Sequence, residues 1–285
     1  MSNPTPNAVV PGCLYLIATP VGNLSDISER ALKVLREADF IAAEDTRVTA
    51  GLLNHFGISK PMTSYFQHNL RYRGEQILER IKAGESCALV SDAGTPAISD
   101  PGEDLVALCA DAGITIYPVP GACAAVLGLI VSGLPTGRFT FEGFLSMNKA
   151  ERSEHLNELK KERYTMIFYE APHKLTRTLA DMRDAFGGDR RIALCRELTK
   201  LHEETQRVSI DEAIQIYTER VPRGEYVLVI DGYKPETEKP YWAELTCAEH
   251  VAMLEEQGMG RMDAIKAAAK ERSVGKSQIY NEIMR

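Results

Sequence analysis

The sequence has no long apolar run and no leader of the kind that directs a chain into or across a membrane. Its most apolar stretch, Ala122–Leu134, contains two glycines and stops at Pro135. A membrane-spanning helix needs about 20 apolar residues, so a buried helix is expected here instead. Residues 1–11 are polar and lack both the basic start and the apolar middle of a signal peptide. We therefore expect no membrane partner.

Patterns of metal ligands are missing as well. The six cysteines lie at positions 13, 87, 109, 123, 195 and 247, and no two have CxxC spacing. The six histidines show no metal-ligand spacing either. Buried free thiols in a reducing compartment are the simpler interpretation of the cysteines. The expectation is a cytoplasmic protein without a metal.

Several common catalytic signatures are absent. The sequence contains no GxxxxGK[ST] loop, no GxGxxG after a strand, no GxSxG elbow and no HExxH helix. Each of these motifs carries a specific mechanism. Their absence argues against P-loop hydrolases, dehydrogenases with the usual fingerprint, and zinc enzymes.

Basic residues are fewer than acidic ones. The chain has 33 Lys and Arg against 40 Asp and Glu, a formal net charge of −7. This balance argues against a nucleic-acid partner, because phosphate binding favours a positive surface. A local basic face can coexist with it, since net charge describes the whole surface. The 285 residues, 44% of them hydrophobic, are enough for two lobes with a sizeable core.

Strands and helices alternate in the first half, which predicts an α/β lobe with a largely parallel sheet. Strands are expected at residues 13–18, 40–43, 87–90 and 115–119. Helices are expected from a cap at Asp26 or Ser28 to about Ala38, at 73–83 and 103–112, and after Pro120-Gly121. Ligand loops of such a sheet lie at the carboxyl ends of its strands.

The second half predicts another α/β lobe, with more strand per helix and a mixed sheet. Strands are expected at residues 139–144, 165–169, 191–196, 203–209 and 226–230, and helices at 149–161, 173–186 and 210–218. Polar residues 232–240, with two prolines, are interpreted as a linker. Helices at 247–257, 261–272 and 277–284 complete the chain. The predicted domains are therefore residues 12–134, 135–232 and 241–285.

One loop stands out. Ser91–Gly102 follows a strand directly and holds two glycines, two prolines, two aspartates and, except for Ile98, no large side chain. Such a loop lets a ligand approach the backbone closely and offers it N–H and carboxylate groups. A strand-to-helix turn capped by Asp100 or Ser99 would explain its end but not Asp92–Pro96. We therefore interpret it as a ligand loop.

Two other segments are more ambiguous. Pro120–Ala125 has small residues at a helix start, which suits either a ligand near free N–H groups or tight helix-on-sheet packing. Glu44–Arg47 places four polar residues where a buried strand ends. From these residues alone, a surface turn is the favoured interpretation.

Together these segments resemble a known family. Leu14–Leu24, Glu44–Arg47, Ser91–Gly102, Val119–Gly121 and Ser132–Pro135 are similar to the first half of the bacterial ribosomal RNA small subunit methyltransferase I family. Phe141–Leu145, Tyr169–His173, Arg196–Lys200 and His202–Glu204 are similar to its second half. The resemblance runs in order from about residue 12 to residue 232. This family is the RNA-modifying branch of the tetrapyrrole methylase superfamily.

The resemblance implies two α/β lobes around a cleft, S-adenosylmethionine as methyl donor, and methylation of a cytidine 2′-hydroxyl in 16S ribosomal RNA of the small ribosomal subunit. It also implies a homodimer. By position in the motifs, the donor pocket would include Pro20, Asp92, Ala93, Thr95, Ala122, Cys123, Ala124, Tyr169 and Ala193. Cys123 stands where the family usually has serine, so any hydroxyl contact would be replaced by a weak thiol one.

Methyl transfer from a sulfonium needs alignment and a base for the ribose hydroxyl, but no metal. The candidates for the base are Asp45 and Glu170, with Arg47 or Lys200 positioning phosphate or lowering the pKa of the hydroxyl. His173 is a further candidate, although it could simply cap a helix. For any single named base, a structural role is the alternative.

RNA contacts are expected at local basic clusters, two of them with an aromatic side chain close by. The candidates are Arg71, Arg73, His173, Lys174 and Lys200. The segment beyond Gly260 is also basic and resembles a helix-turn-helix, but it could equally be an appendage that packs on a partner subunit.

Two other functions stay open at this point. A methylase of a small tetrapyrrole-like acceptor would share the fold and the donor site; Glu44–Arg47 and Tyr169–His173 match the RNA branch instead. A non-catalytic RNA-binding protein is the other alternative, and the intact Ser91–Gly102 loop argues against it.

Overall fold

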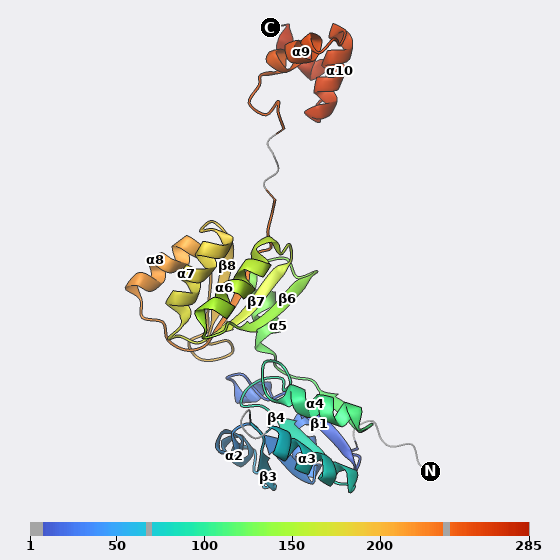
Figure 1. Ribbon diagram of the computed structural model, residues 1–285, viewed down its shortest axis with the longest axis vertical. Coiled ribbons are helices and arrows are strands. Elements are labelled where there is room, and N and C mark those ends of the chain that lie inside the picture. Colours follow the sequence, from blue (N-terminus) through green and yellow to red (C-terminus); the bar gives the residue numbers. More distant parts are fainter. Residues whose placement is uncertain (1–7, 67–69, 236–239, 285) are drawn as a thin grey trace. The chain divides into compact units, whose positions relative to one another are not determined.

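The computed structural model describes residues 8–66, 70–235 and 240–284, and the chain falls into two compact units that meet between Tyr233 and Lys234. The first unit contains two α/β lobes and the second is a small helical module (Figure 1). This confirms the predicted fold class. Part of the predicted linker, residues 236–239, lies outside the described residues.

The first lobe is built on a parallel sheet of five strands in the order β3-β2-β4-β1-β5. Its strands are β1 (Cys13–Ile17), β2 (Phe40–Ala43), β3 (Met62–Ser64), β4 (Cys87–Val90) and β5 (Thr115–Val119). The helices between them are α1 (Glu29–Glu37), α2 (Thr46–His55), α3 (Leu70–Lys82) and α4 (Gly102–Asp111), with a short 3-10 turn η1 (Leu24–Asp26) before α1.

Helices cover both faces of this sheet, which is why its central strands are continuous apolar runs. β2 and β4 are buried along their whole length. Side chains of α1 and α2 pack on one face and those of α3 and α4 on the other. Because the strands are parallel, the loops that follow β1, β2, β4 and β5 all emerge at the same edge.

The second lobe has a mixed sheet in the order β6-β7-β10-β8-β9, in which β6 and β7 are parallel and the other neighbours antiparallel. Its strands are β6 (Phe139–Phe144), β7 (Thr165–Glu170), β8 (Arg191–Arg196), β9 (Glu204–Ser209) and β10 (Tyr226–Ile230). Its helices are α5 (Ala124–Ser132), α6 (Lys149–Glu158), α7 (Leu175–Phe186) and α8 (Ile210–Glu219), with the 3-10 turn η2 (Leu159–Lys161) after α6.

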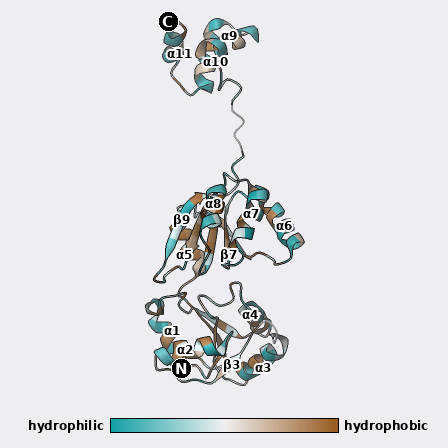
Figure 2. Ribbon diagram, turned by 90° about the vertical axis from the view of Figure 1, so that its left-hand side faces the viewer, coloured by the Kyte–Doolittle hydropathy of each residue, from teal (hydrophilic) through white to brown (hydrophobic). Residues whose placement is uncertain are grey.

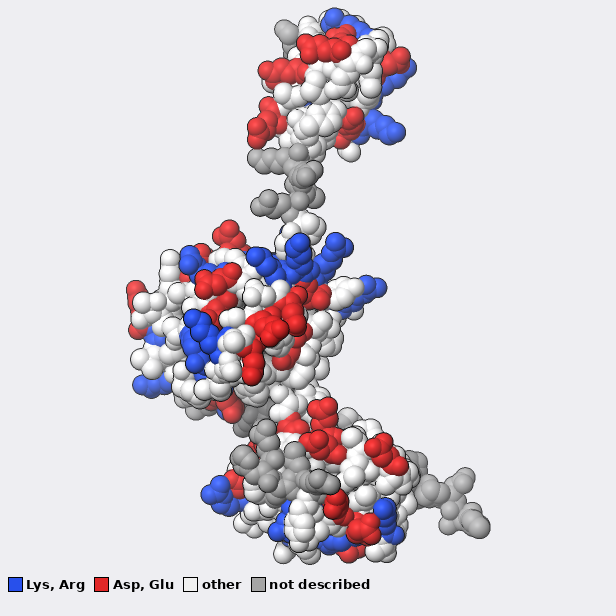
Figure 3. Space-filling view, viewed as in Figure 1, with Lys and Arg blue, Asp and Glu red and all other residues white. Residues whose placement is uncertain are grey.

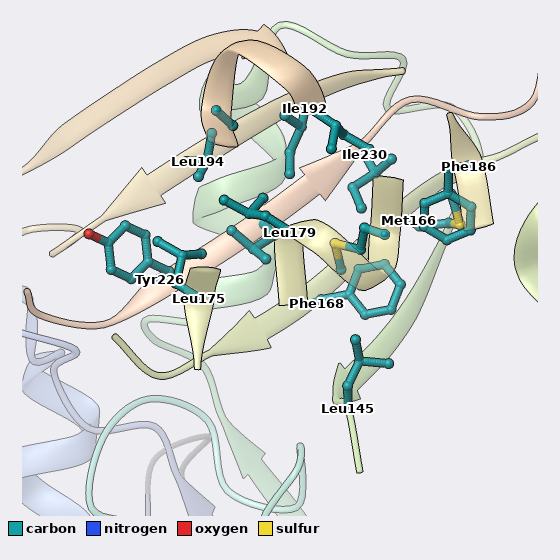
Figure 4. Packing of buried hydrophobic residues seen from close by; sticks show 14 of the residues in the cluster. Leu145, Met166, Phe168, Leu175, Leu179, Phe186, Ile192, Leu194, Tyr226 and Ile230 are labelled. Carbon is teal, nitrogen blue, oxygen red and sulfur yellow. The ribbon is translucent and has the colours of Figure 1, made fainter. Parts of the chain in front are cut away.

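The two faces of this second sheet are covered differently. On one face α6, α7 and α8 bury a large apolar cluster around Met166, Phe168 and Leu179 (Figure 4). On the other face α5 packs alone, over Ile167, Ala193 and Val227. Figure 2 shows the same pattern, hydrophobic strands beneath helices that carry hydrophilic residues on their outer sides.

The second unit consists of α9 (Cys247–Glu256), α10 (Arg261–Glu271) and α11 (Lys276–Ile283), packed on a small apolar core that includes Leu254, Ile265 and Ile279. Thr246 caps α9 with a capping box. Across the described part of the chain, every helix is too short or too polar to cross a membrane.

Two local predictions need correction, and one open alternative is settled. The surface turn favoured for Glu44–Arg47 is wrong, because Asp45 is the N-cap of α2, a helix that the sequence prediction missed. The helix expected to open at Pro120-Gly121 begins three residues later, at Ala124. Of the two caps considered for α1, Ser28 is the one that accepts a hydrogen bond from a helix N–H.

Glycine lets α5 approach the second sheet closely. A Cβ on Gly128 would lie 2.6 Å from Cγ1 and 3.0 Å from Cβ of Val227, whereas a Cβ on Gly51 of α2 would have no atom within 4 Å. We expect Gly128→Ala to lower the free energy of unfolding by about 1–2 kcal/mol through overpacking. Gly51→Ala should raise it by about 0.5–1 kcal/mol, because alanine is the better helix former. Urea unfolding of both variants measures this, and equal shifts would contradict the close packing of α5.

Candidate active site

The loops at the carboxyl edge of the first sheet surround two cavities. The loop after β1 is tied to the loop after β4 by two backbone hydrogen bonds, from Thr19 N–H to Gly94 O (2.8 Å) and from Gly94 N–H to Thr19 O (3.1 Å). The first cavity, with a volume of about 360 Å³, is lined by residues of both lobes. The second, of about 240 Å³, is lined by the first lobe alone. Ser91 and Asp92 line both cavities.

Most of the residues expected at a donor pocket line the first cavity. They are Asp92, Ala93, Thr95, Cys123, Ala124 and Tyr169. The Tyr169 hydroxyl accepts a hydrogen bond from the Ala125 N–H at 3.0 Å, and burial raises its pKa to about 12. This contact joins β7 of the second lobe to the start of α5.

The other three expected donor residues lie elsewhere. Pro20 lines the second cavity. Ala122 lies behind the first one, where its carbonyl accepts a hydrogen bond from Thr95 Oγ1 at 2.8 Å. Ala193 is buried in the core beneath α5, and Cys195, two residues further along β8, reaches the first cavity instead.

The loop Ser91–Gly102 keeps an unusual backbone path. Ala97 and Ser99 have positive φ values of 67° and 64°, which L residues rarely adopt. Asp100 holds this path: its carboxylate accepts hydrogen bonds from the N–H groups of Ala97 (3.0 Å), Ile98 (3.3 Å) and Gly102 (2.7 Å). Local strain of this kind is common at ligand sites.

The charged side chains of the first cavity are mostly acidic. Among its described lining residues, six are acidic (Glu44, Asp92, Asp100, Glu170, Glu197 and Glu225) and one, Lys200, is basic. Burial raises the pKa of Glu44, and the nearby charge of Asp92 raises it further. Burial also raises the pKa of Asp92. Glu44 Oε2 lies 3.4 Å from the backbone N of Asp92, and we call these two neighbouring residues of the first cavity the Glu44–Asp92 pair.

The expected catalytic residues Asp45 and Arg47 lie at the start of α2, and neither lines either cavity. Asp45 accepts from the Arg47 N–H at 2.8 Å and pairs with the guanidinium at 2.6 Å. Hydrogen bonding to Arg47 lowers the pKa of Asp45 to about 2. Its own N–H donates to Asp92 Oδ1 at 3.0 Å, so Asp45 helps to hold Asp92 in place.

Glu170 lines the first cavity but is 3% exposed, and both its oxygens are engaged. Oε2 accepts from Thr178 Oγ1 at 2.5 Å and Oε1 from the Ala171 N–H at 2.8 Å. These contacts anchor the loop after β7.

Lys200 is similarly committed, at 2.9 Å from Glu197 and 3.0 Å from Glu225. It also packs against the first lobe: a Cβ on Gly22 would lie 2.3 Å from Lys200 Cγ.

The remaining basic candidates whose side chains are described lie on two different lobes. Arg73, near the start of α3, donates to Gln76 and lies over the Tyr72 ring. The side chain of Arg71 lies outside what the structure describes. His173 is exposed and Lys174 half-buried, both just before α7 in the second lobe.

Residues 13–214 match the profile of the Tetrapyrrole (Corrin/Porphyrin) Methylases. The chain also superposes on cobalt precorrin-4 methyltransferase (TM-score 0.57, 16% identity, 77% of this chain and 95% of that one). A Thermus thermophilus uroporphyrin-III C-methyltransferase complexed with S-adenyl homocysteine gives a TM-score of 0.54 at 16% identity, over 77% and 97% of the two chains. The fold and the profile place this chain in the tetrapyrrole methylase family.

Sequence similarity identifies a more specific family within the tetrapyrrole methylases. A protein of Synechocystis sp. named ribosomal RNA small subunit methyltransferase I is 46% identical over 269 residues, covering 94% of this chain and 96% of that protein. The protein of the same name in Bacillus subtilis (strain 168) is 45% identical over 273 residues, covering 95% and 93%. The chain belongs to the ribosomal RNA small subunit methyltransferase I family.

The roles of two residues in this site, Glu44 and Asp100, were not predicted from the sequence. Glu44 lay in a segment interpreted as a surface turn, although the position directly after a buried parallel strand was the available signal. Asp100 was considered as a helix cap or as a carboxylate of the ligand loop, and its three hydrogen bonds to the loop backbone follow from a path that no local pattern predicts.

The Asp45–Arg47 ion pair predicts a pH dependence of stability. A carboxyl whose pKa is lowered on folding stabilises the protein above its unfolded pKa, and this contribution is lost as the pH falls toward the folded value of about 2. Asparagine keeps the N-cap but not the ion pair. We expect wild type to be more stable than Asp45→Asn at neutral pH, and the difference to shrink below about pH 4. Urea midpoints across pH measure it; a difference that grows in acid would contradict this assignment.

Proposed function

We propose that this protein transfers a methyl group from S-adenosylmethionine to the 2′-hydroxyl of a cytidine in 16S ribosomal RNA of the small ribosomal subunit, in the cytoplasm. The observation that carries the proposal is the acid-lined cavity between the lobes of a chain 46% identical to a ribosomal RNA small subunit methyltransferase I. The cavity supports a cationic small molecule as donor, and similarity to a ribosomal RNA methyltransferase supports RNA as the acceptor.

The first cavity fits the donor in size and charge. Its volume of about 360 Å³ falls in the range of roughly 300–1,000 Å³ that small-molecule sites occupy. Carboxylates such as Asp92 and Asp100 attract the positive sulfur and can accept hydrogen bonds from ammonium and hydroxyl groups. When bound, the donor supplies a methyl group on a sulfonium, a leaving group that is already activated.

The ribose hydroxyl needs a proton acceptor, and we assign this role to the Glu44–Asp92 pair. Its carboxylates have raised pKa values, which suits proton transfer better than the low pKa of Asp45. As the new O–C bond forms and the S–C bond breaks, the hydroxyl proton passes to this pair and then to water. No step calls on a metal ion.

The catalytic residues expected from sequence keep supporting roles in this scheme. Asp45 fixes Asp92 through its N–H, and Arg47 fixes Asp45 through the ion pair. Glu170 positions the loop after β7, next to the aromatic ring of Tyr169.

RNA phosphates would meet the basic side chains outside the cavity. Arg73 with Tyr72 on α3, and His173 with Lys174 before α7, offer charge and a ring for stacking. Arg71 adds to the first cluster in sequence. Lys200 contributes less, because two glutamates offset its charge. On the face drawn in Figure 3, basic side chains gather at one end of the second lobe with a group of acidic side chains beside them, and charges of both signs are scattered elsewhere over the described residues.

The function is tested by incubating the protein with S-adenosylmethionine labelled in its methyl group and either free 16S ribosomal RNA or intact small subunits. We expect the label on a cytidine ribose. Label on a base, or none on RNA from a protein that still binds the donor, would overturn the assignment. In the latter case, tetrapyrrole-like acceptors would be assayed next.

The same assay tests the proton acceptor. Glu44→Gln and Asp92→Asn should each lower kcat by about 10²-fold or more, while Asp45→Asn should have a smaller effect. In wild type, kcat should fall as the pH drops through the raised pKa of the pair. A Glu44→Gln enzyme with unchanged kcat and pH profile would remove Glu44 from the pair. Donor affinity, measured by calorimetry, shows whether Asp92 also contributes to binding.

We further propose a homodimer formed through the exposed side of α5. This helix is apolar almost throughout, and Val126 and Ile130, one turn apart, are 46% and 62% exposed. Phe139 and Phe141 are also exposed, and Phe141 pairs with Ile167, whose side chain packs beneath α5. These residues form an apolar patch on one side of the second lobe, of a kind that favours a second copy.

Ile130→Glu should shift the protein from dimer to monomer in analytical ultracentrifugation, because a charge would be buried at the contact. Val221→Glu is the matched control, since Val221 is 74% exposed in the loop after α8. A dimer that survives Ile130→Glu would move the interface to another surface.

A further inference from the structure

The second cavity shares Ser91 and Asp92 with the first but has far fewer charged side chains. It lies between the loop after β1 and one face of α2, the face that carries Val48, Gly51 and Leu52. Of its ten described lining residues, Asp92 alone carries a charge. The acidic first cavity suits a small cation, whereas this one suits a neutral and partly apolar group.

Its walls are suited to a flat ring. Leu24 and Val48 line the cavity and are 40% and 48% exposed, so two aliphatic side chains stand open without a packing partner large enough to cover them. Thr19 and Ser91 complete the wall, and their hydroxyls donate to carbonyls of the loops that enclose the cavity. Enzymes that act on a nucleotide extrude it into a pocket of this kind, with apolar contacts on its faces and hydrogen bonds at its edges.

The cavity also limits the size of its occupant. Its volume of about 240 Å³ is below the range of roughly 300–1,000 Å³ that holds larger ligands. One unstacked nucleoside fits such a space better than a tetrapyrrole macrocycle or a stack of bases. Arg47, next to Val48 in the chain, exposes 89% of its side chain and can meet a phosphate outside the cavity.

We propose that the second cavity receives the single flipped-out nucleoside that is methylated, with its ribose at Asp92. This inference rests on the proposed function and adds to it the site of the acceptor. Because Asp92 lines both cavities, a hydroxyl that reaches it from the second one meets both the proton acceptor and the donor side of the junction. The base then lies against the aliphatic wall of α2, and the RNA backbone stays outside.

Gly51 allows the cavity to be filled without disturbing the fold. It lines the cavity, lies on the exposed side of α2, and a Cβ built on it has no atom within 4 Å. Gly51→Leu and the graded variant Gly51→Ala therefore add volume to the cavity at a helical position that tolerates side chains. Gly137→Leu is the matched control, since a Cβ on Gly137 also meets no atom within 4 Å and Gly137 lines neither cavity.

The experiment compares these variants in full-length protein by calorimetric titration with S-adenosylmethionine and by methyl transfer to RNA at saturating donor. For Gly51→Leu we expect kcat/KM for RNA to fall by about tenfold or more while the donor Kd stays within about twofold. Gly51→Ala should show a smaller loss, and Gly137→Leu should match wild type.

The outcomes separate this inference from the proposed function. If wild type methylates RNA and Gly51→Leu does so equally well, the acceptor lies elsewhere and the inference is overturned, whereas the function stands. A tenfold weaker donor Kd in Gly51→Leu would also overturn it, because the second cavity would then belong to the donor. If wild type transfers no methyl group to RNA, the function and the inference fall together.

Discussion

The two backbone hydrogen bonds between Thr19 and Gly94 are the constraint on which the rest of the site depends. They tie the loop after β1 to the loop after β4, two neighbouring parallel strands, at the edge where a doubly wound sheet binds its ligands. The loop after β4 turns at Gly94 with a φ of 85°, a value that glycine adopts without strain. Thr19, on the other loop, is 2% exposed. The joined loops separate two cavities, and Asp92 lines both of them.

Strain on both sides of the first cavity is held by carboxylates. Asp100 fixes the left-handed residues Ala97 and Ser99, each of which costs about 1–2 kcal/mol in an ordinary loop. In the second lobe Glu197 itself has a positive φ of 52°, and it accepts hydrogen bonds from the Glu225 N–H and Lys200. These acidic residues therefore shape the backbone as well as the electrostatics of the cavity, which accounts for acidic side chains that no proton transfer requires.

The sequence was sufficient for most of the scaffold, because β2, β4 and β10 are buried runs bounded by clear breaks. It failed at α2. Thr46, Val48, Thr49 and Gly51 are poor helix formers, so Glu44–Arg47 was interpreted as a surface turn and no helix was predicted after it. The helix is held by packing instead of propensity. The loop Ser91–Gly102 was identified from its composition, yet its division between two cavities depends on contacts with Thr19 and α2, which are distant in sequence. A motif predicts which residues lie near a ligand, but it does not predict which cavity each residue lines.

The acidic first cavity also bears on the net charge of −7, which argues against a nucleic-acid partner. Six carboxylates around a small space repel phosphates and attract a cation, so an RNA backbone would be excluded from the place where chemistry occurs. In the arrangement that we propose, the neutral ribose hydroxyl of an extruded nucleoside would reach Asp92 from the second cavity while its phosphates stay in solvent. Such an enzyme needs only small basic clusters at the rim, such as Arg73 with Tyr72, because phosphate contacts fix position and need not supply the specificity. An acidic protein and an RNA substrate are compatible under this proposal, since the cavity charge that would oppose RNA binding would also attract the cationic methyl donor.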